Sequence, residues 1–538
     1  MENNDRTQGG GSVMSTSAVL PPESQWHNQI TGESAANLFK PNVTDFIFAL
    51  VAFVLGYVFV RWVLFTGRGW GVSAFTTVYL LTSALYLIKK GAFVKRREAI
   101  FWMAVTWLTG LSYALWENEG ISSIRMFFMF CAAVYYVIVA TGTTLLGKTS
   151  NFLILDGIRA VIILPFRNFI NQYVSFSVIA KGERKGKFLP VFIGITVALI
   201  LAAIIIPLLE RADAGGFGMI MNFFRSAFWF DYHVSIYYII LSVPVAAYLY
   251  GLISGAVHKK GTDFISPEGA TNTVKAMRVI QPTTINIVLG AVCVLYLVFI
   301  FSQLPYFFSA FTGVKPEGWR AYSEFARHGF FELCWIAAIN LAILTVGNIC
   351  NKKLRMESKV LRVFNIVLAL ITLVLIATAF SKMALYIGAF GLTMRRLLPC
   401  VFMVFIAVVF VALIALQKWD FSIVRFSAIV GAVIIVGLCF SNPDAMVVRY
   451  NTNRYLSGTL RNFDTEVLWR SGAAGVLPAI EVYNNSSLNE NRRQQLRWYI
   501  SSHYSLWGGS NRISLEFYRA SQAARAGGFR VPAPTSMW

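Results

Sequence analysis

Charged side chains are scarce in this chain of 538 residues: Asp, Glu, Lys and Arg make up 14% of it, whereas hydrophobic residues make up 56%. An ordinary soluble domain is about 25% charged and about 45–50% apolar. So large an excess of apolar side chains does not fit inside a soluble core, and lipid must solvate part of the surface. The composition therefore predicts an integral membrane protein.

The sequence also lacks the patterns of common metal sites, disulfide frameworks and catalytic motifs. The six cysteines include no Cys-x-x-Cys pair, and the five histidines show no His-x-x-x-His spacing. Walker loops, Gly-x-Ser-x-Gly elbows and evident Cys–His pairs are missing as well. We predict no catalytic residue, no metal and no cofactor, and we expect the cysteines to be small buried apolar residues.

Long apolar windows are abundant. A helix needs about 20 apolar residues to cross the roughly 30 Å hydrocarbon layer, where it satisfies its own backbone hydrogen bonds. We therefore predict an all-α fold, a polytopic transmembrane helix bundle of about 11 spans. The eleven windows are 45–65, 71–88, 99–116, 126–146, 189–209, 233–257, 283–302, 330–350, 360–380, 398–416 and 424–440.

Two further apolar stretches are not predicted to cross. The run near 152–180 holds Asp156, Arg159 and Arg167 in its first half, so no clean window spans it. The run 216–231 is rich in Phe and Met but too short to cross. We predict interfacial helices near 152–180 and 216–231, the first of them interfacial or re-entrant.

Orientation is predicted from the basic residues, which are retained on the cytoplasmic side in short loops. With the N-terminus inside, 25 Lys and Arg fall in inner segments, 11 in the short outer loops and 11 in the C-terminal segment. The opposite orientation inverts that ratio. We therefore expect a cytoplasmic N-terminus and an extracytoplasmic C-terminus.

Three regions follow from these windows. Residues 1–44 are polar and read as a disordered cytoplasmic leader without a signal peptide. Residues 45–440 form the transmembrane helical domain. Residues 441–538 lose the apolar windows, carry eleven arginines and no lysine, and are predicted to form a small helical extracytoplasmic C-terminal tail.

Two polar segments are predicted to meet at the outer mouth of the bundle. Residues 320–332 lead into the eighth span, and residues 381–396 form the outer loop before the tenth. Charges at a membrane boundary are costly unless paired or hydrated, so we expect an Arg–Glu contact between the segments. It is either a latch between helices or a site that binds an anionic head group or relays a proton. The candidate site residues are Arg320, Tyr322, Glu324, Arg327, His328, Glu332, Tyr386, Arg395 and Arg396.

Other polar residues are given structural roles. Asn340, Asn348 and Asn365 lie within predicted spans, where asparagine is more often an interhelical hydrogen-bond partner than a ligand. Glu117 and Glu119 lie in an outer loop and are interpreted as solvated charges.

Three motifs carry a resemblance to a known family. They are YSEFARHGFFEL, the Tyr-x-Gly-x-x-Gly-Leu-Thr-x-Arg pattern from Tyr386 to Arg395, and Asn-Pro-Asp-Ala from Asn442. In these segments the chain resembles a family of polytopic bacterial membrane proteins catalogued as a domain of unknown function, over roughly Val191 to Leu477. The resemblance implies a bacterial cytoplasmic membrane and a shared core built from the three segments, and it implies no activity.

Several functions compete. We favour a transporter or lipid-handling protein, because eleven helices with polar groups at one mouth exceed what an anchor needs. A non-catalytic envelope sensor or scaffold is the alternative, and a membrane-embedded transferase on a lipid-linked substrate is the second alternative. The expected partners are the lipid bilayer and an anionic lipid or envelope protein. Nucleic acid is not expected, since the basic residues are divided among short loops.

Overall fold

The computed structural model describes most of the chain beyond residue 38. The described residues are 39–94, 96–178, 232–259, 265–312, 322–353, 357–460, 464–484, 489–502 and 513–529, with isolated positions between 190 and 219. The predicted leader lies almost wholly outside them. The predicted span 189–209 and the predicted interfacial helix 216–231 also lie outside them, apart from isolated positions.

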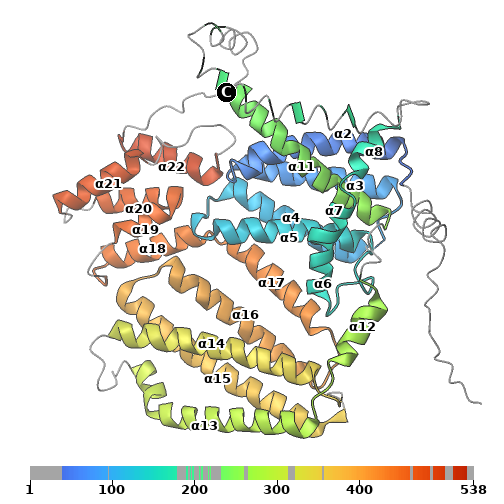
Figure 1. The fold of residues 1–538 in the computed structure, drawn as a ribbon. Coiled ribbons are helices and arrows are strands. Elements are labelled where there is room, and N and C mark those ends of the chain that lie inside the picture. The colour runs from blue at the N-terminus through green and yellow to red at the C-terminus, as the bar shows by residue number, and fades with distance from the viewer. Residues whose placement is uncertain are drawn as a thin grey trace, which may run out of the picture.

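The long helices form two bundles (Figure 1). The first surrounds one apolar core and contains α2 (Val43–Val58), continued by the π-helical turn η1 (Phe59–Leu64), α3 (Trp70–Lys89), α4 (Arg96–Leu115), α5 (Ser122–Ala140) and α11 (Tyr232–Val257). The second surrounds another core and contains α13 (Pro282–Thr312), α14 (Tyr322–Ile349), α15 (Lys359–Phe390) and α16 (Met394–Leu416). Helix α17 (Ile423–Phe440) contacts α4 and α16 and so joins the bundles.

The all-α prediction is confirmed: apart from an isolated bridge between Ile280 and Asn351, the described residues contain no β-structure. Nine helices in the described part of the chain are long and apolar enough to cross a membrane, and each matches a predicted span. The span predicted at 99–116 corresponds to α4, which packs between α3 and α5 but begins with charged residues and is less apolar. About eleven spans remain consistent with this structure.

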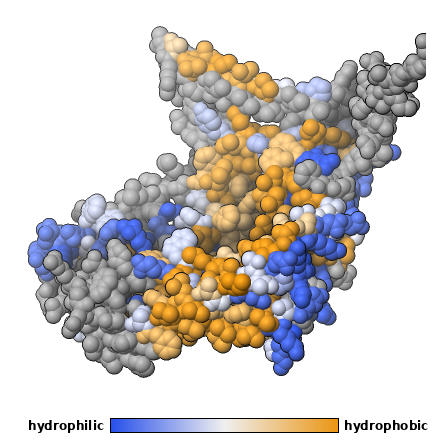
Figure 2. Space-filling view, turned by 60° about the horizontal axis from the view of Figure 1, so that its bottom comes forward, coloured by the Kyte–Doolittle hydropathy of each residue, from blue (hydrophilic) through white to orange (hydrophobic). Residues whose placement is uncertain are grey.

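The outer surface of the bundles is apolar, as a lipid-facing surface must be. Figure 2 shows hydrophobic residues gathered over the middle of the helices and hydrophilic residues toward both ends. Large apolar side chains stand exposed on helices of both bundles, including Leu81, Phe127, Val298 and Trp335. The structure thus presents the hydrophobic band expected of a protein embedded in a bilayer.

Polar contacts join helix ends at one end of the molecule, which we call the proximal end because α2 begins there. Asp45 at the start of α2 is buried and accepts a hydrogen bond of 2.8 Å from the Lys90 ammonium after α3. Arg425 at the start of α17 forms a 2.8 Å ion pair with Glu98 of α4. Loops that the sequence assigns to one membrane side therefore meet each other.

The remaining helix ends meet at the opposite, distal end. Asn118, in the turn after α4, donates a 2.8 Å hydrogen bond to the carbonyl oxygen of Cys439 near the end of α17. The loop between α15 and α16 is bonded to Asn451, beyond α17. This two-ended arrangement is what an alternating up-and-down topology requires.

The C-terminal helices pack together at the distal end around their own apolar core (Figure 1). They are α18 (Pro443–Leu456), α19 (Thr465–Arg470), the 3-10 turn η7 (Gly472–Gly475), α20 (Val476–Tyr483), α21 (Glu490–Ser502) and α22 (Leu515–Ala526). Leu468, Val476 and Tyr499 are buried in this core, at positions where the sequence predicts short helices. We call these helices the distal cap.

The segment after α5 forms short helices, namely α6 (Leu153–Ile158), η3 (Arg159–Ile163), α7 (Leu164–Arg167) and α8 (Asn171–Phe176). In Figure 1 they run across the long helices, not alongside them. Asp156 is buried and accepts a 2.6 Å hydrogen bond from the Leu145 amide. Helix α12 (Pro267–Ala276) lies between the bundles in the sequence. An interfacial or re-entrant placement of 152–178 stays a prediction.

The intramembrane asparagines are interhelical partners, as predicted. Asn340 of α14 donates to Thr372 of α15 at 2.9 Å and accepts from the Tyr296 hydroxyl of α13 at 2.8 Å. Asn348 and Asn365 bond each other across α14 and α15. Their amides hold the second bundle together and line no part of the cavity described below.

Glycine permits the close approach of α2 and α11. A Cβ added at Gly56 would lie 2.7 Å from the backbone carbonyl oxygen of Ser242, and backbone cannot move aside as a side chain can. We expect Gly56→Ala to lower the free energy of unfolding in detergent by about 1–3 kcal/mol, measured by reversible denaturation. Gly437→Ala in α17 is the control, because a Cβ there meets nothing within 4 Å. Equal effects of the two changes would contradict this packing argument.

Candidate functional site at the distal end

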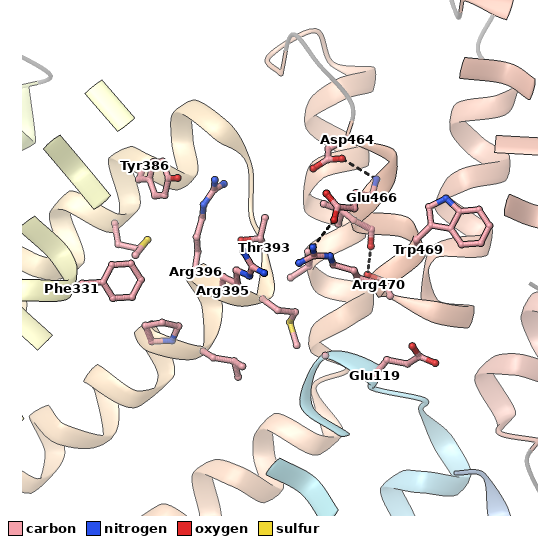
Figure 3. A pocket seen from close by; sticks show the side chains of 18 residues that line it. Glu119, Phe331, Tyr386, Thr393, Arg395, Arg396, Asp464, Glu466, Trp469 and Arg470 are labelled. Carbon is pink, nitrogen blue, oxygen red and sulfur yellow. Dashed lines mark hydrogen bonds and ion pairs between the residues drawn. The ribbon is translucent and has the colours of Figure 1, made fainter. Parts of the chain in front are cut away.

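A cavity of about 1180 Å³ lies where the two bundles and the distal cap meet. Its walls come from the turn after α4, from α14, α15 and α16 of the second bundle, and from α18 and α19 of the cap. Figure 3 shows Arg395 and Arg396 between Tyr386 on one side and Glu466 and Arg470 on the other. Three of the predicted site residues therefore share one cavity.

The two arginines owe their position to a sharp turn. Helix α15 continues to Phe390, so the predicted outer loop at 381–396 is corrected to a helix end, the turn 391–393 and the first turn of α16. Lys382 and Met383 are buried in that helical extension, which explains why it stays ordered. Gly391 has φ of +79°, a conformation open to glycine, and the chain reverses there.

Arg396 is held by its neighbours, whereas Arg395 is not. The Arg396 guanidinium donates to the carbonyl oxygens of Phe390 and Gly391 and lies 4.1 Å from the centre of the Tyr386 ring. Arg395 is exposed and makes no hydrogen bond, ion pair or ring contact with the described residues. The Arg396 guanidinium is therefore held in place by the protein, whereas the Arg395 guanidinium is available to bind a ligand.

The acids of the cavity are already engaged. Glu466 forms a 2.5 Å ion pair with Arg470, and Asp464 accepts a 2.9 Å hydrogen bond from the Glu466 amide as the N-cap of α19. Glu119 forms a 2.7 Å ion pair with Arg68. Two arginines at the start of α16 are left without a carboxylate partner, so the cavity favours an anionic ligand.

Residues 320–332, the first of the two predicted polar segments, contribute less to the cavity than expected. Arg320 lies outside the described residues, as do the side chains of Tyr322, Glu324, Arg327 and His328. Glu332 is exposed and does not line the cavity, although its neighbour Phe331 does. The predicted contact of Glu332 with Arg395 or Arg396 is corrected: the described cation whose charge interacts with Glu332 is Lys382 of α15.

Helix α18 fixes the turn that carries the arginines. The Asn451 side chain accepts a 2.7 Å hydrogen bond from the Leu392 amide and donates one of 2.7 Å to the Leu392 carbonyl oxygen. Arg454 donates to the carbonyl oxygen of Gly388 at 2.7 Å. A Cβ at Gly391 would lie 2.5 Å from the Asn451 oxygen, so the glycine also makes room for this contact.

Beside the cavity, three carboxyl groups are buried where the cap meets the first bundle. The Glu516 carboxyl of α22 accepts a 3.1 Å hydrogen bond from the Glu117 amide, and it also accepts from Asn442. Asp444 accepts one of 3.0 Å from the Gly120 amide, and the Glu117 carboxyl accepts one of 2.8 Å from the amide of Ala473. We call Glu117, Asp444 and Glu516 the junction acids.

Among the described residues, Arg125 is the cation that acts on Asp444 of this cluster. Arg125 of α5 is buried, but it donates to the carbonyl oxygens of Trp116 and Glu117 and lies 3.6 Å from the centre of the Tyr113 ring. Glu119 acts on Asp444, and Tyr113 and Cys439 lie near Arg125. Asp444 and Glu516 thus lie close to other carboxyl groups, and protonation of an acid relieves the repulsion between them.

Burial raises the pKa values of two junction acids, Asp444 and Glu516, above their usual range. It raises the pKa of Asp444 to about 6, and Glu117 and Glu119 add to the rise while the Gly120 amide opposes it. Burial likewise raises the pKa of Glu516 to about 7, with hydrogen bonds from Asn442 and Glu117 opposing. One Asp444 oxygen is buried and has no hydrogen-bond partner among the described residues, which disfavours the ionised form further. Within the described residues no group of His, Cys, Asp or Glu is arranged to hold a metal ion.

Sequence reasoning missed this cluster. Glu117 is 5% exposed, so its interpretation as a solvated charge was wrong, and Glu119 is ion-paired. The sequence feature that could have indicated the cluster is Asn442-Pro443-Asp444, which is typical of a helix start. Asn442 caps α18, and Pro443 occupies its first turn. The motif served as a mark of resemblance, although Asp444 is completely buried. No local pattern points to Glu516.

Comparison with known proteins gives one match. A family model described as a domain of unknown function, DUF4153, covers residues 103–482. This range begins well before Val191, where the resemblance read from the sequence begins, and it includes the turn after α4, the cavity walls of the second bundle, α18 and α19. No curated protein and no solved structure matches the chain.

The raised pKa values of Asp444 and Glu516 predict that docking of the distal cap depends on pH. A raised pKa means that the docked state binds protons more tightly, so this stabilisation is complete below the ordinary pKa values and is lost as the pH rises through about 6 to 7. Hydrogen-exchange protection of α18 and α22, corrected for intrinsic exchange, should fall by about tenfold or more between pH 5 and pH 8.

Glu516→Gln should weaken that pH dependence, because the amide stays neutral. Glu481→Gln is the matched control, since Glu481 is exposed on α20 of the same cap. Protection that rises with pH, or an identical pH profile for the two variants, would contradict the role of the junction acids.

Proposed function

We propose that this protein binds an anionic ligand in the distal cavity, as part of transport or lipid handling. The premise is that the chain belongs to the DUF4153 family, whose domain has no known function, and that it has many helices able to cross a membrane. The observation that carries the proposal is the pair Arg395 and Arg396, placed side by side in a cavity of about 1180 Å³. Neither has a carboxylate partner among the described residues.

The ligand class follows from the wall chemistry. Arginine guanidinium groups present a planar fork of donors that matches phosphate and carboxylate oxygens. Tyr386, Phe331 and Trp469 add apolar surface around them. This combination fits an anionic group attached to an apolar body better than it fits a small inorganic ion.

A purely structural latch fits the contacts less well. A latch requires the arginines to be neutralised across helices, and Arg395 makes no such contact with the described residues. An exposed and unpaired guanidinium contributes little to stability. Its placement is explained better by a ligand that supplies the missing acceptors.

We further propose that the distal end faces outward in a bacterial cytoplasmic membrane, with a cytoplasmic N-terminus. The basic residues support this orientation, with 25 in the segments assigned to the proximal side and 11 in the short loops assigned to the distal side. The distal cavity and the distal cap are then extracytoplasmic, and the ligand reaches them from the outer side.

Ligand binding is tested with Arg395→Gln in nanodiscs. We expect phosphatidylglycerol to raise the melting temperature of the unmodified protein relative to phosphatidylcholine, and free phosphate added to phosphatidylcholine discs to separate a soluble anion from a lipid head group. Arg395→Gln should reduce the apparent affinity about tenfold or more, since hydrogen bonds to charged groups contribute about 1.5–3 kcal/mol. Arg497→Gln removes the same charge from an exposed position on α21 and should have no effect. Equal affinities of both variants and the unmodified protein for every anion would reject the proposal.

Orientation is tested with reporter fusions. An enzyme active outside the cytoplasm should function when fused after Ala445, which follows α17, and should be inactive when fused after Lys353, which follows α14. A cytoplasmic reporter should give the opposite pattern. Activity of the first reporter at Lys353 alone would reverse the proposed orientation.

A further inference from the structure

A second cavity, of about 950 Å³, lies within the first bundle. Its walls come mainly from η1, α3, α5 and α11, which belong to helices long and apolar enough to cross a membrane, with further lining residues from α4 and α7. Phe75, Met126, Phe130 and Leu249 are among the lining residues. We call it the apolar cavity.

Several hydroxyl groups along its walls are hydrogen-bonded to backbone carbonyl oxygens. The Tyr79 hydroxyl donates to the carbonyl oxygen of Ala133 at 3.3 Å, and the Tyr248 hydroxyl donates to that of Val161 at 3.0 Å. Thr76 bonds back to the carbonyl oxygen of Val72 in its own helix. With these hydroxyls satisfied, the walls present carbon to any occupant.

Polar groups gather at one end of the apolar cavity. Arg68, Ser122 and Ser123 line it at the distal end, where α5 begins. Most of the other lining residues are apolar and include Phe166 and Phe169, whose rings are stacked with centres 6.3 Å apart. The cavity therefore has a polar head and an apolar body, which is the polarity of a lipid.

The length also fits one leaflet. The lining residues of α5 run from Ser122 to Val134, about 18 Å of helix at 1.5 Å per residue. Half of the roughly 30 Å hydrocarbon layer is about 15 Å. The rim includes Phe127, which is 71% exposed, and Phe166, which is 62% exposed, so the cavity opens sideways toward the bilayer.

An ion pair joins the wall of the apolar cavity to the wall of the distal cavity. Arg68 lines the apolar cavity, Glu119 lines the distal one, and their side chains pair at 2.7 Å. Ser122 and Ser123 follow Glu119 and Gly120 directly in the sequence. An amphiphile with its tail in the apolar cavity would have its head group at this pair, beside the space that Arg395 and Arg396 occupy.

We propose that the apolar cavity holds an acyl chain of a membrane phospholipid, whose anionic head group lies at the Arg68–Glu119 pair and faces the distal cavity. The proposal rests on the proposed function and makes its ligand a lipid. Dispersion contacts retain the chain, and the arginines select the anionic head.

The test uses phosphatidylglycerol with a photoreactive diazirine near the end of one acyl chain, in nanodiscs containing the full chain. After irradiation, labelled peptides are mapped by mass spectrometry and compared with the lipid-facing surface of α13, where Val298 and Phe301 are exposed. We expect labelling of α5 and α11 around the apolar cavity to exceed that of α13 several-fold. Equal labelling of the three helices would overturn the proposal.

Two variants place a larger side chain in the apolar cavity, each from a different helix. They are Ala133→Phe on α5 and Val245→Phe on α11. Each should reduce labelling of the cavity several-fold without changing labelling of α13. Ala104→Phe is the matched control, because Ala104 is exposed on α4 and does not line the cavity. Unchanged labelling in both filling variants, or cross-links from these residues to a second protein chain in place of lipid, would overturn the proposal.

The two proposals fail in different ways. If Arg395→Gln leaves anion binding intact while Ala133→Phe removes lipid labelling, the acyl-chain site stands and the distal cavity is not the anion site. If Arg395→Gln abolishes anion binding while the filling variants change neither binding nor labelling, the distal cavity binds an anion that is not held as a lipid. The latter result overturns the acyl-chain site alone.

Discussion

The burial of the junction acids is the constraint on which the distal half of this protein depends. Glu117, Asp444 and Glu516 come from the turn after α4, from α18 and from α22, and docking removes all of them from water together. Backbone amides and the Asn442 side chain replace part of the lost hydration. Because burying an ionised carboxylate is costly, we expect docking of the distal cap to depend on the protonation of this cluster.

That docking creates the distal cavity. Its walls belong to three units that pack around separate apolar cores, so the cavity forms where the cap and the two bundles come together. Asn442 and Asp444 anchor the start of α18 to the first bundle and α22, while Asn451 anchors the same helix to the turn before Arg395. The same helix α18 therefore contacts both the junction acids and the turn that carries the arginines.

Much of the fold follows from the sequence, because the cost of exposing backbone polar groups to hydrocarbon is local and leaves a continuous apolar window. The nine described spans, the helical cap and the hydrogen-bonding role of Asn340, Asn348 and Asn365 were all predictable in this way. The candidate site was predicted in part. Tyr386, Arg395 and Arg396 do share a cavity, but Glu332 does not line it, and α15 continues as helix to Phe390 where the sequence predicts a loop.

The sequence by itself determined that the chain is an all-helical membrane protein, where most of its spans lie and which short motifs mark its polar end. Tertiary structure alone decided which polar groups are buried together. Glu117 and Glu516 are 399 residues apart in the chain, and each taken singly looks like an ordinary surface acid. Their burial depends on how the cap packs against the first bundle. A contact between distant segments produces no periodicity or spacing that can be recognised in a single sequence. The apolar length of a span, by contrast, can be recognised because its residues are consecutive.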